Sequence, residues 1–297
     1  MTAPLFGIDL GGTQIKGCAV SHDGQVLAHL ERETSAGGVE ALLGGVRGLL
    51  DDLTDQAGVP AGVGLAAPGI AAIDHRSIAT MPGRLEGLEG LDWGEQLALG
   101  QPVAVLNDAH AFVLGEAWAG AARERRNVIG LTLGTGVGGG VLVDGALYRG
   151  ATGRAGHLGH LSLNPDGPLD ITNTPGSLED AIGECSLPIR SGKRFARTVD
   201  LLAAAAAGDA HATEVWAASV HALAAAVASL INAFDPEAVV IGGGVSQAGD
   251  ALLAPLRERL EQIEWRPTGR PVPVLLAELG AWSGAVGAAK YATHEPV

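Results

Sequence analysis

The sequence predicts an α/β protein of two similar domains that face each other across a cleft. Apolar runs of strand length alternate along the chain with longer segments of helical periodicity, which is typical of sheets covered by helices. A glycine hairpin near the N-terminus occurs a second time near the middle, which indicates a repeated unit. Glycine makes up 45 of the 297 residues and gathers where predicted strands end.

The first half of the chain contains the elements of one domain. Their boundaries follow from apolar alternation, leucine spacing and glycine or proline punctuation. In chain order, the sequence predicts two strands around a glycine turn (4–20), a third strand (25–31), a helix (39–56), buried strands at 62–67 and 103–106, and a helix at 109–122.

After residues 123–127 the pattern starts again. Residues 130–143 can be laid over residues 7–20 without a gap, so that the glycines at 7, 11 and 17 fall on those at 130, 134 and 140. Both segments predict a strand, a glycine turn and a strand. A chance similarity between two glycine hairpins is the alternative to a true repeat.

The rest of the chain supplies the elements of the second domain. A loop-rich stretch comes first, at 148–197. The elements predicted after it are helices at 199–207 and 213–234, a strand at 238–241, a helix at 250–263, a strand at 272–276 and a final helix at 284–293.

Composition and charge exclude several classes of protein. A hydrophobic content of 47% excludes a disordered chain, and the net charge of −14 without a basic run argues against nucleic acid as a partner. The apolar tract at 217–234 is interrupted by polar residues and predicts a buried helix rather than a membrane span. With no secretory signal at residues 1–8 and two cysteines, we expect a soluble cytoplasmic protein.

Three glycine clusters follow apolar strands and are candidates for binding phosphate. Glycine at a strand end lets backbone N–H groups approach an anion without a side chain in the way, although a glycine pair can also mark an ordinary hairpin. The first cluster does not match a P-loop, because no Gly-Lys-Ser/Thr sequence occurs, or a dinucleotide fingerprint, because a predicted strand follows it. The three clusters are Gly11-Gly12-Thr13, Gly134-Thr135-Gly136 and Gly242-Gly243-Gly244. A nucleotide held between two domains would explain all three.

Two acidic residues stand beside strand ends. Asp9 precedes the first glycine turn, where a carboxylate can anchor Mg²⁺; a turn-capping aspartate is the alternative. Asp108 follows a buried strand, where a carboxylate can accept the proton of a phosphoryl-acceptor hydroxyl while Asn107 holds the substrate. The alternative is that Asp108 caps the helix that begins there.

Taken as a set, these motifs resemble those of the ROK family of sugar kinases. The matching segments cover nearly the whole chain in order and are Asp9-Leu-Gly-Gly-Thr13, Asn107-Asp108-Ala109, Leu133-Gly-Thr-Gly-Val-Gly138 and Ile241-Gly-Gly-Gly-Val245. The resemblance implies the actin/hexokinase fold, with two ribonuclease-H-like domains and an interdomain cleft. It places residues 1–120 and 284–297 in one domain and residues 121–283 in the other. It also implies ATP, Mg²⁺ and a sugar as ligands, and a homodimer.

The same resemblance implies a role for each motif residue. Asp108 is the general base, Asn107 and Gly69 line the sugar pocket, and Asp9 serves Mg²⁺ indirectly. The residues that approach the nucleotide and its phosphates are Gly11, Gly12, Thr13, Gly134, Thr135, Gly136, Gly243 and Gly244.

One departure from the family pattern concerns the sugar site. The family usually carries Gly-Glu-x-Gly-His after the second hairpin, whereas this chain has Gly156-His-Leu-Gly-His160. His160 matches, and His157 replaces the glutamate. A neutral imidazole offers one acceptor and one donor where a carboxylate accepts two hydrogen bonds. We interpret both histidines as sugar-site or structural residues rather than as a metal pair.

A second departure concerns the loop that often binds structural zinc in the family. Asp170, Thr172 and Ser177 stand where three cysteines would, so we predict no zinc site. Glu179 matches a glutamate that contacts the sugar. The alternative is that Glu179 is a carboxylate in the first turn of a helix that follows Ser177.

The leading hypothesis is ATP-dependent phosphorylation of a hexose hydroxyl, with glucose to glucose 6-phosphate as the first choice. Kinases for another hexose or an N-acetylhexosamine, and polyphosphate as the donor, stay open. A catalytically weak sugar-binding sensor is a second class. We expect it to lack a DNA-binding domain, because the first hairpin starts within ten residues of Met1. Nucleotide hydrolysis without a sugar is a third option.

Overall fold

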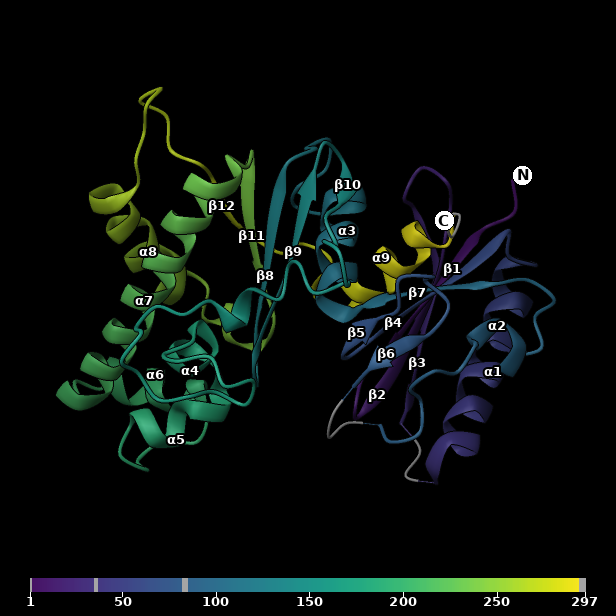
Figure 1. The fold of residues 1–297 in the computed structure, drawn as a ribbon, viewed down its shortest axis with the longest axis horizontal. Coiled ribbons are helices and arrows are strands. Elements are labelled where there is room, and N and C mark those ends of the chain that lie inside the picture. The colour runs from purple at the N-terminus through teal and green to yellow at the C-terminus, as the bar shows by residue number, and fades with distance from the viewer. Residues whose placement is uncertain (1, 35–36, 82–84, 294–297) are drawn as a thin grey trace.

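Residues 2–34, 37–81 and 85–293 are described by the computed structural model, and they form two β-sheets with a pair of helices between them (Figure 1). The first sheet contains β1 (Leu5–Leu10), β2 (Gln14–Val20), β3 (Val26–Glu33), β4 (Gly62–Ala67) and β7 (Val103–Asn107). The second contains β8 (Val128–Leu133), β9 (Val137–Val143), β10 (Ala146–Leu147), β11 (Ala238–Gly242) and β12 (Val274–Leu276).

The two sheets have the same topology. Their strand orders are β3-β2-β1-β4-β7 and β10-β9-β8-β11-β12. In each sheet three strands form an antiparallel meander, and two later strands are added in parallel to the first strand of that meander. The prediction of two similar α/β units is therefore confirmed, and the repeated hairpin is the start of each sheet.

The ungapped overlay of the two hairpins is wrong by one residue in the returning strand. Leu10 pairs with Ile15 in the first hairpin, whereas Leu133 pairs with Val137 in the second. The second turn is therefore one residue shorter. Because of the shorter turn, Gly139 rather than Gly140 is the counterpart of Gly17. The ungapped overlay would therefore place the side chains of the returning strand on the wrong face of the sheet.

Helices cover the outer faces of both sheets. α1 (Gly38–Ala57) lies against β2 and β3 and buries its leucines at helical spacing. The second sheet is covered by α7 (Ala210–Phe234) and α8 (Asp250–Ile263), with α6 (Thr198–Ala206) and α4 (Leu178–Ile182) packed on α7. By length and composition α7 could cross a membrane, but half of its most apolar window is buried inside the protein, as predicted for a core helix. The shorter elements are β5 (Ile70–Ala71), β6 (Ile78–Thr80), α2 (Trp93–Gln96) and α5 (Leu187–Arg190).

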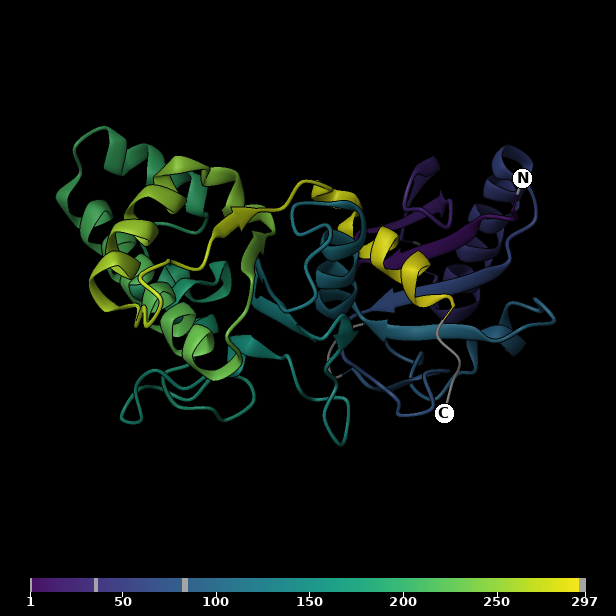
Figure 2. The same ribbon diagram turned by 90° about the horizontal axis from the view of Figure 1, so that it is seen from above.

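Two helices exchange sides between the sheets. α3 (Asp108–Ala119) follows β7 of the first sheet but packs mainly on β8 and β9, whereas α9 (Ser283–Tyr291) follows the second sheet and packs on β1 and β4 (Figure 2). The two helices also pack closely against each other. α9 thus agrees with the predicted membership of residues 284–297 in the first domain, of which 294–297 lie outside the described residues. Because α3 contacts both sheets, the domain boundaries stay a prediction.

Glycine makes this crossing possible. A Cβ at Gly287 would clash with the carbonyl oxygen of Ala111, and one at Gly115 with the carbonyl oxygen of Ser283. On the first sheet, Gly7 meets the backbone of α9 in the same way. Part of the glycine surplus therefore allows the backbones of two helices to pack against each other. The assignment of the glycine clusters to phosphate binding did not predict this packing.

A buried carboxylate joins the two connections between the sheets. Glu116 on α3 is 0% exposed and accepts hydrogen bonds from the backbone N–H groups of Ala121 (2.9 Å), Glu278 (3.0 Å) and Leu279 (3.0 Å). It also accepts one from the hydroxyl of Ser283 (2.7 Å). Ala121 lies on the connection from α3 to the second sheet, Glu278 and Leu279 lie on the connection that returns to α9, and Ser283 is the first residue of α9. Glu116 therefore fixes both connections at one point.

Candidate functional site

Most of the predicted site residues lie at the carboxyl ends of strands. Asp9 is the second-last residue of β1, which the first glycine turn follows; Gly69 follows β4; and Asn107 ends β7 directly before Asp108, the first residue of α3. These three strands are adjacent and parallel, so their ends meet at one edge of the first sheet. On the second sheet, the loops after β8 and β11 are also neighbours, and a Cβ on Gly134 would lie 4.0 Å from the backbone nitrogen of Gly244.

The two hairpin turns present backbone donors. In the turn after β8, the carbonyl groups of Gly134 and Thr135 accept hydrogen bonds from the N–H groups of Glu184 (3.0 Å) and Cys185 (2.8 Å). Among the described residues, no acceptor pairs with the N–H groups of Thr135 and Gly136. The same holds for Gly12 and Thr13 in the first turn. N–H groups arranged in this way can bind an anion.

Asp9 is a half-buried carboxylate beside a helix N-terminus. Burial raises the pKa of Asp9 to about 7; the charge of Asp108 adds to this effect, and Lys16, its partner across β1 and β2, opposes it. A Cβ on Gly284, in the first turn of α9, would clash with the Asp9 carboxylate, so glycine is needed there. Asp9 and Asp108 therefore form an acidic pair at the sheet edge, and a cation between them would relieve their repulsion.

We expect Asp9→Asn to remove a pH dependence of stability. Because the pKa of Asp9 is 3.8 in a model peptide and about 7 in the folded chain, the folded state alone keeps this proton between those values. Stability thus falls as pH rises from about 4 to 7, by about 2–4 kcal/mol. Urea unfolding without Mg²⁺ at pH 5 and pH 8 measures the slope. A variant with the wild-type slope would contradict this assignment.

Asn107, not Asp108, caps α3. The Asn107 side-chain oxygen accepts from the N–H groups of Ala109 (2.9 Å) and His110 (3.2 Å), while its amide donates to the carbonyl of Gly69 (2.8 Å). The alternative of Asp108 as the helix cap is therefore wrong. Asp108 is the first residue of the helix and is partly exposed, and its carboxylate also accepts from Ala109 N–H (2.8 Å).

The segment aligned with the zinc loop is organised by hydrogen bonds. Asp170 accepts from Nδ1 of His160 (2.8 Å) with one oxygen, and with the other from the N–H and hydroxyl of Thr172 (both 2.8 Å) and the N–H of Thr174 (2.9 Å). Burial raises the pKa of Asp170, but these hydrogen bonds outweigh it and hold that pKa below its usual range. An ionised carboxylate thus holds the His160 ring in place.

His157 stands three residues before His160, in the loop after β10. Burial, and next the charge of His160, lower the pKa of His157, which keeps its imidazole neutral at pH 7. Its Nε2 atom is buried, and no described residue hydrogen-bonds to it. A buried polar atom without a partner is costly, so this atom is a candidate contact for a ligand.

Glu179 reaches from α4 to the second glycine turn. It stands in the first turn of α4, which Ser177 caps, so the interpretation as a first-turn carboxylate describes its backbone position correctly. Its side chain accepts a hydrogen bond from the N–H of Val137 (2.8 Å), and a Cβ on Gly136 would clash with it. Glu179 is therefore tied directly to one of the predicted phosphate loops.

Sequence reasoning missed three residues that organise this site: His110, Glu116 and Gly284. Glu116 carried a signal, since it is a single charged residue within an otherwise apolar predicted helix. His110 and Gly284 carried none, because their contacts lie on segments distant in the sequence.

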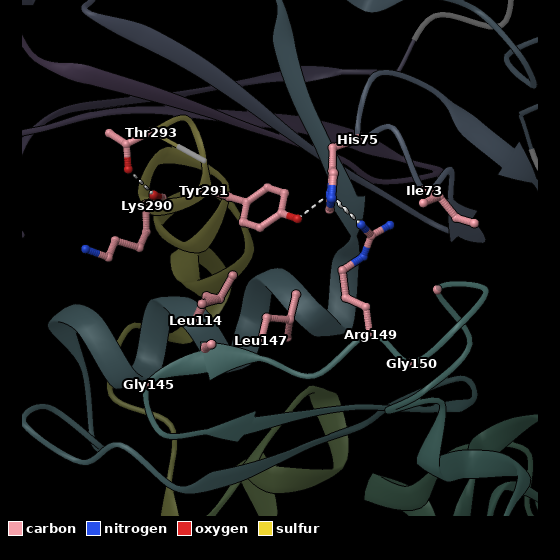
Figure 3. A pocket seen from close by; sticks show the side chains of 12 residues that line it. Ile73, His75, Leu114, Gly145, Leu147, Arg149, Gly150, Lys290, Tyr291 and Thr293 are labelled. Carbon is pink, nitrogen blue, oxygen red and sulfur yellow. Dashed lines mark hydrogen bonds between the residues drawn. The ribbon is translucent and has the colours of Figure 1, made fainter. Parts of the chain in front are cut away.

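A separate cavity of about 620 Å³ lies between the two halves, beside the middle of α3 (Figure 3). Tyr291 from α9 and Arg149 from the segment after β10 both point toward His75 and hydrogen-bond to it. Arg149 also donates to the carbonyl groups of Ala71 (3.0 Å) and Ala72 (2.8 Å). This cluster is a second contact between the halves, and none of the predicted site residues lines the cavity.

Known proteins resemble the chain over nearly its full length. A glucokinase of Thermotoga maritima is 36% identical over 86% of both chains, and an N-acetyl-D-glucosamine kinase of Aliivibrio fischeri is 30% identical over 96% of this chain and 97% of its own. Among solved structures, the ROK hexokinase from Thermus thermophilus matches with a TM-score of 0.84 and 33% identity over 97% of both chains. A ROK glucokinase from Streptomyces griseus, in complex with glucose and AMPPNP, matches with a TM-score of 0.79 and 28% identity over 97% of this chain and 99% of its own.

The family itself matches residues 5–295. That range includes both sheets, the crossing helices and all of the motif residues described above. The chain therefore belongs to the ROK family, and its fold is the actin/hexokinase-like fold of the ROK sugar kinases.

Proposed function

We propose that the chain transfers the γ-phosphoryl group of ATP to a hydroxyl group of a hexose, with glucose as the first choice. The observation that carries this proposal is the position of Asp108. The capping of α3 is done by Asn107, which leaves the Asp108 carboxylate at the strand-end edge beside Asp9. A carboxylate at such an edge suits a general base.

Residues from both sides of the cleft bind the sugar and the nucleotide. Asn107, Gly69, His157, His160 and Glu179 hold the sugar. The ATP phosphates are bound by the N–H groups of the two hairpin turns, Gly11, Gly12, Thr13, Gly134, Thr135 and Gly136, and Gly243 and Gly244 approach the adenosine. Both sheets contribute to each set, because one hairpin turn of the phosphate set comes from each sheet, and Asn107 and Gly69 of the sugar set lie on the first sheet whereas His157, His160 and Glu179 follow the hairpin of the second.

In the transfer, Asp108 accepts the proton of the sugar hydroxyl while the oxygen of that hydroxyl forms a bond to the γ-phosphorus of ATP. The bond between that phosphorus and the oxygen bridging to the β-phosphate breaks, and ADP leaves. Asn107 cannot replace Asp108 as the base, because an amide does not accept a proton near neutral pH and its oxygen already caps α3. The catalytic contribution of the chain is mainly positioning.

The acidic pair fits a divalent cation. Asp9 is half-buried and has a raised pKa beside Asp108, so a positive charge between the two would favour their ionised forms. Mg²⁺, when bound with ATP, neutralises charge on the phosphates, and Asp9 would hold it, through water in our interpretation. Binding of MgATP near pH 7 is then coupled to proton release from Asp9.

The substrate is proposed from the relatives and from His157. The Thermotoga and Streptomyces proteins are named glucokinases, which favours glucose, and the Aliivibrio protein favours an N-acetylhexosamine as the second candidate. A neutral His157 in place of the family glutamate changes the hydrogen bonds available to the sugar. A weak sugar-binding sensor is the alternative from another class.

A coupled assay of ADP release over a panel of hexoses and N-acetylhexosamines tests the proposal. We expect MgATP-dependent turnover with glucose above the rate without sugar. Turnover with N-acetylglucosamine alone would identify the second candidate, and sugar binding without turnover would identify the sensor. ADP release that no sugar stimulates would indicate nucleotide hydrolysis. A parallel series with polyphosphate in place of ATP tests the donor.

Other expectations from the family resemblance are part of the same proposal. We predict a cytoplasmic homodimer without structural zinc. The zinc prediction is supported by Asp170, whose hydrogen bonds to His160, Thr172 and Thr174 organise the loop. Metal analysis of the purified protein tests it, and stoichiometric Zn²⁺ would contradict it.

A further inference from the structure

We propose that His110 is a positioning residue that fixes the loop carrying His157 relative to Asp108, and thereby sets the affinity for the sugar. The inference rests on the proposed function and extends it to a residue outside the family motifs described above. His110 is the third residue of α3, two positions after Asp108, and is 1% exposed.

The side chain of His110 connects α3 to the loop after β10. Its Nε2 lies 2.8 Å from the carbonyl oxygen of Ala155. A carbonyl oxygen can only accept, so Nε2 carries the hydrogen and donates. Burial, and next the charge of His157, lower the pKa of His110 to about 4. The ring is therefore neutral and acts as a fixed donor rather than as a proton carrier.

The backbone of His110 belongs to the catalytic end of the same helix. Its N–H group donates to the side-chain oxygen of Asn107 (3.2 Å), the residue that also holds Gly69 through its amide. His110 is thus bonded through its backbone to the predicted sugar residues of the first sheet. Through its side chain it is bonded to the loop that belongs to the second sheet.

The loop is shaped around the His110 ring. Gly156 has φ +91°, and a Cβ there would lie 2.8 Å from Nε2 of His110, so glycine is required both by its conformation and by this contact. The next residue, His157, packs its ring on that of His110 with centroids 5.5 Å apart and planes at 66°. The position of the His157 ring therefore depends on His110.

The test compares His110→Leu with His110→Gln. Leucine fills volume but leaves the carbonyl of Ala155 unpaired, whereas glutamine retains an N–H donor. With the preferred sugar of the wild-type protein, we expect the leucine variant to raise KM for the sugar about tenfold while KM for MgATP changes by less than about twofold. We expect glutamine to restore most of the sugar affinity.

The control is His211→Leu on α7, which removes a partly buried ring whose Nε2 likewise lies near a backbone carbonyl, that of Ser191 (3.1 Å). We expect it to leave KM for the sugar unchanged. If His110→Leu lowers the melting temperature without splitting the two KM values, or if glutamine rescues nothing, His110 has a structural role and the proposal is wrong. If the wild-type protein phosphorylates no sugar, the proposed kinase function is wrong, whatever the role of His110. Calorimetric sugar binding by the same three variants then tests His110 on its own.

Discussion

Replacing Asp108 by asparagine is expected to lower kcat for sugar phosphorylation by about 10²–10⁴-fold while sugar binding stays measurable. Asparagine has nearly the same shape and can still accept from the N–H of Ala109, so α3 keeps its first turn. It cannot take the proton from the sugar hydroxyl. Steady-state ADP release and calorimetric binding of the sugar, measured on the same preparation, separate the two effects.

Asp250→Asn is the matched control for this variant. Asp250 is also the first residue of a helix, α8, and it is exposed. It tests whether loss of one acidic charge at a helix start changes turnover by itself, and we expect no change. Substantial residual kcat in the Asp108 variant would refute its role as the base. Loss of sugar binding together with turnover would indicate a role in holding the sugar.

The second large effect is expected on stability. Glu116→Ala leaves three backbone N–H groups without their acceptor in a site that is 0% exposed, while the hydroxyl of Ser283 can still donate to the carbonyl of Gly280 (2.9 Å). Since each unsatisfied buried donor costs about 1–3 kcal/mol, we expect a loss of about 3–5 kcal/mol, which lowers the melting temperature by about 10 °C. Glu116→Gln retains one acceptor oxygen but turns an NH₂ group toward backbone donors, so we expect an intermediate loss.

Thermal unfolding of the two variants beside Glu261→Gln measures this effect. Glu261 is an exposed residue on α8, and we expect its variant to unfold within a degree or two of the wild type. Wild-type stability in Glu116→Ala would show that the two connections between the sheets are held by other contacts, such as the packing of α3 on α9. Equal losses for alanine and glutamine would mean that the negative charge alone matters.

Much of the fold could be predicted from the sequence because it depends on local patterns. The leucines of α1 and the apolar runs of β4, β7 and β11 carry their own periodicity, and the repeated hairpin indicated two sheets. The one-residue difference between the hairpin turns could not be predicted, since glycines occur at both possible registers of β9. The exchange of α3 and α9 depends on contacts between residues far apart in the chain, such as Gly287 with Ala111.

In the candidate site, too, the features that follow local sequence patterns could be predicted, and those that depend on contacts between distant residues could not. Asp9, Asn107 and the glycine turns were found because each lies at the end of a predicted strand, and the topology of the sheet brings neighbouring strand ends together. The cap of α3 was assigned to the wrong residue because asparagine and aspartate are both favoured caps, and the backbone angles decide between them. His110 was missed because the carbonyl it binds comes 45 residues later in the chain.

The placement of α9 has a consequence for how the protein is made. Because this helix covers β1 and β4, the first sheet to leave the ribosome keeps one apolar, glycine-lined face uncovered until nearly the whole chain has been synthesised. α9 therefore reaches the first sheet only after the strands of the second sheet have been synthesised. Until then that face is an exposed apolar surface, and exposed apolar surface promotes aggregation.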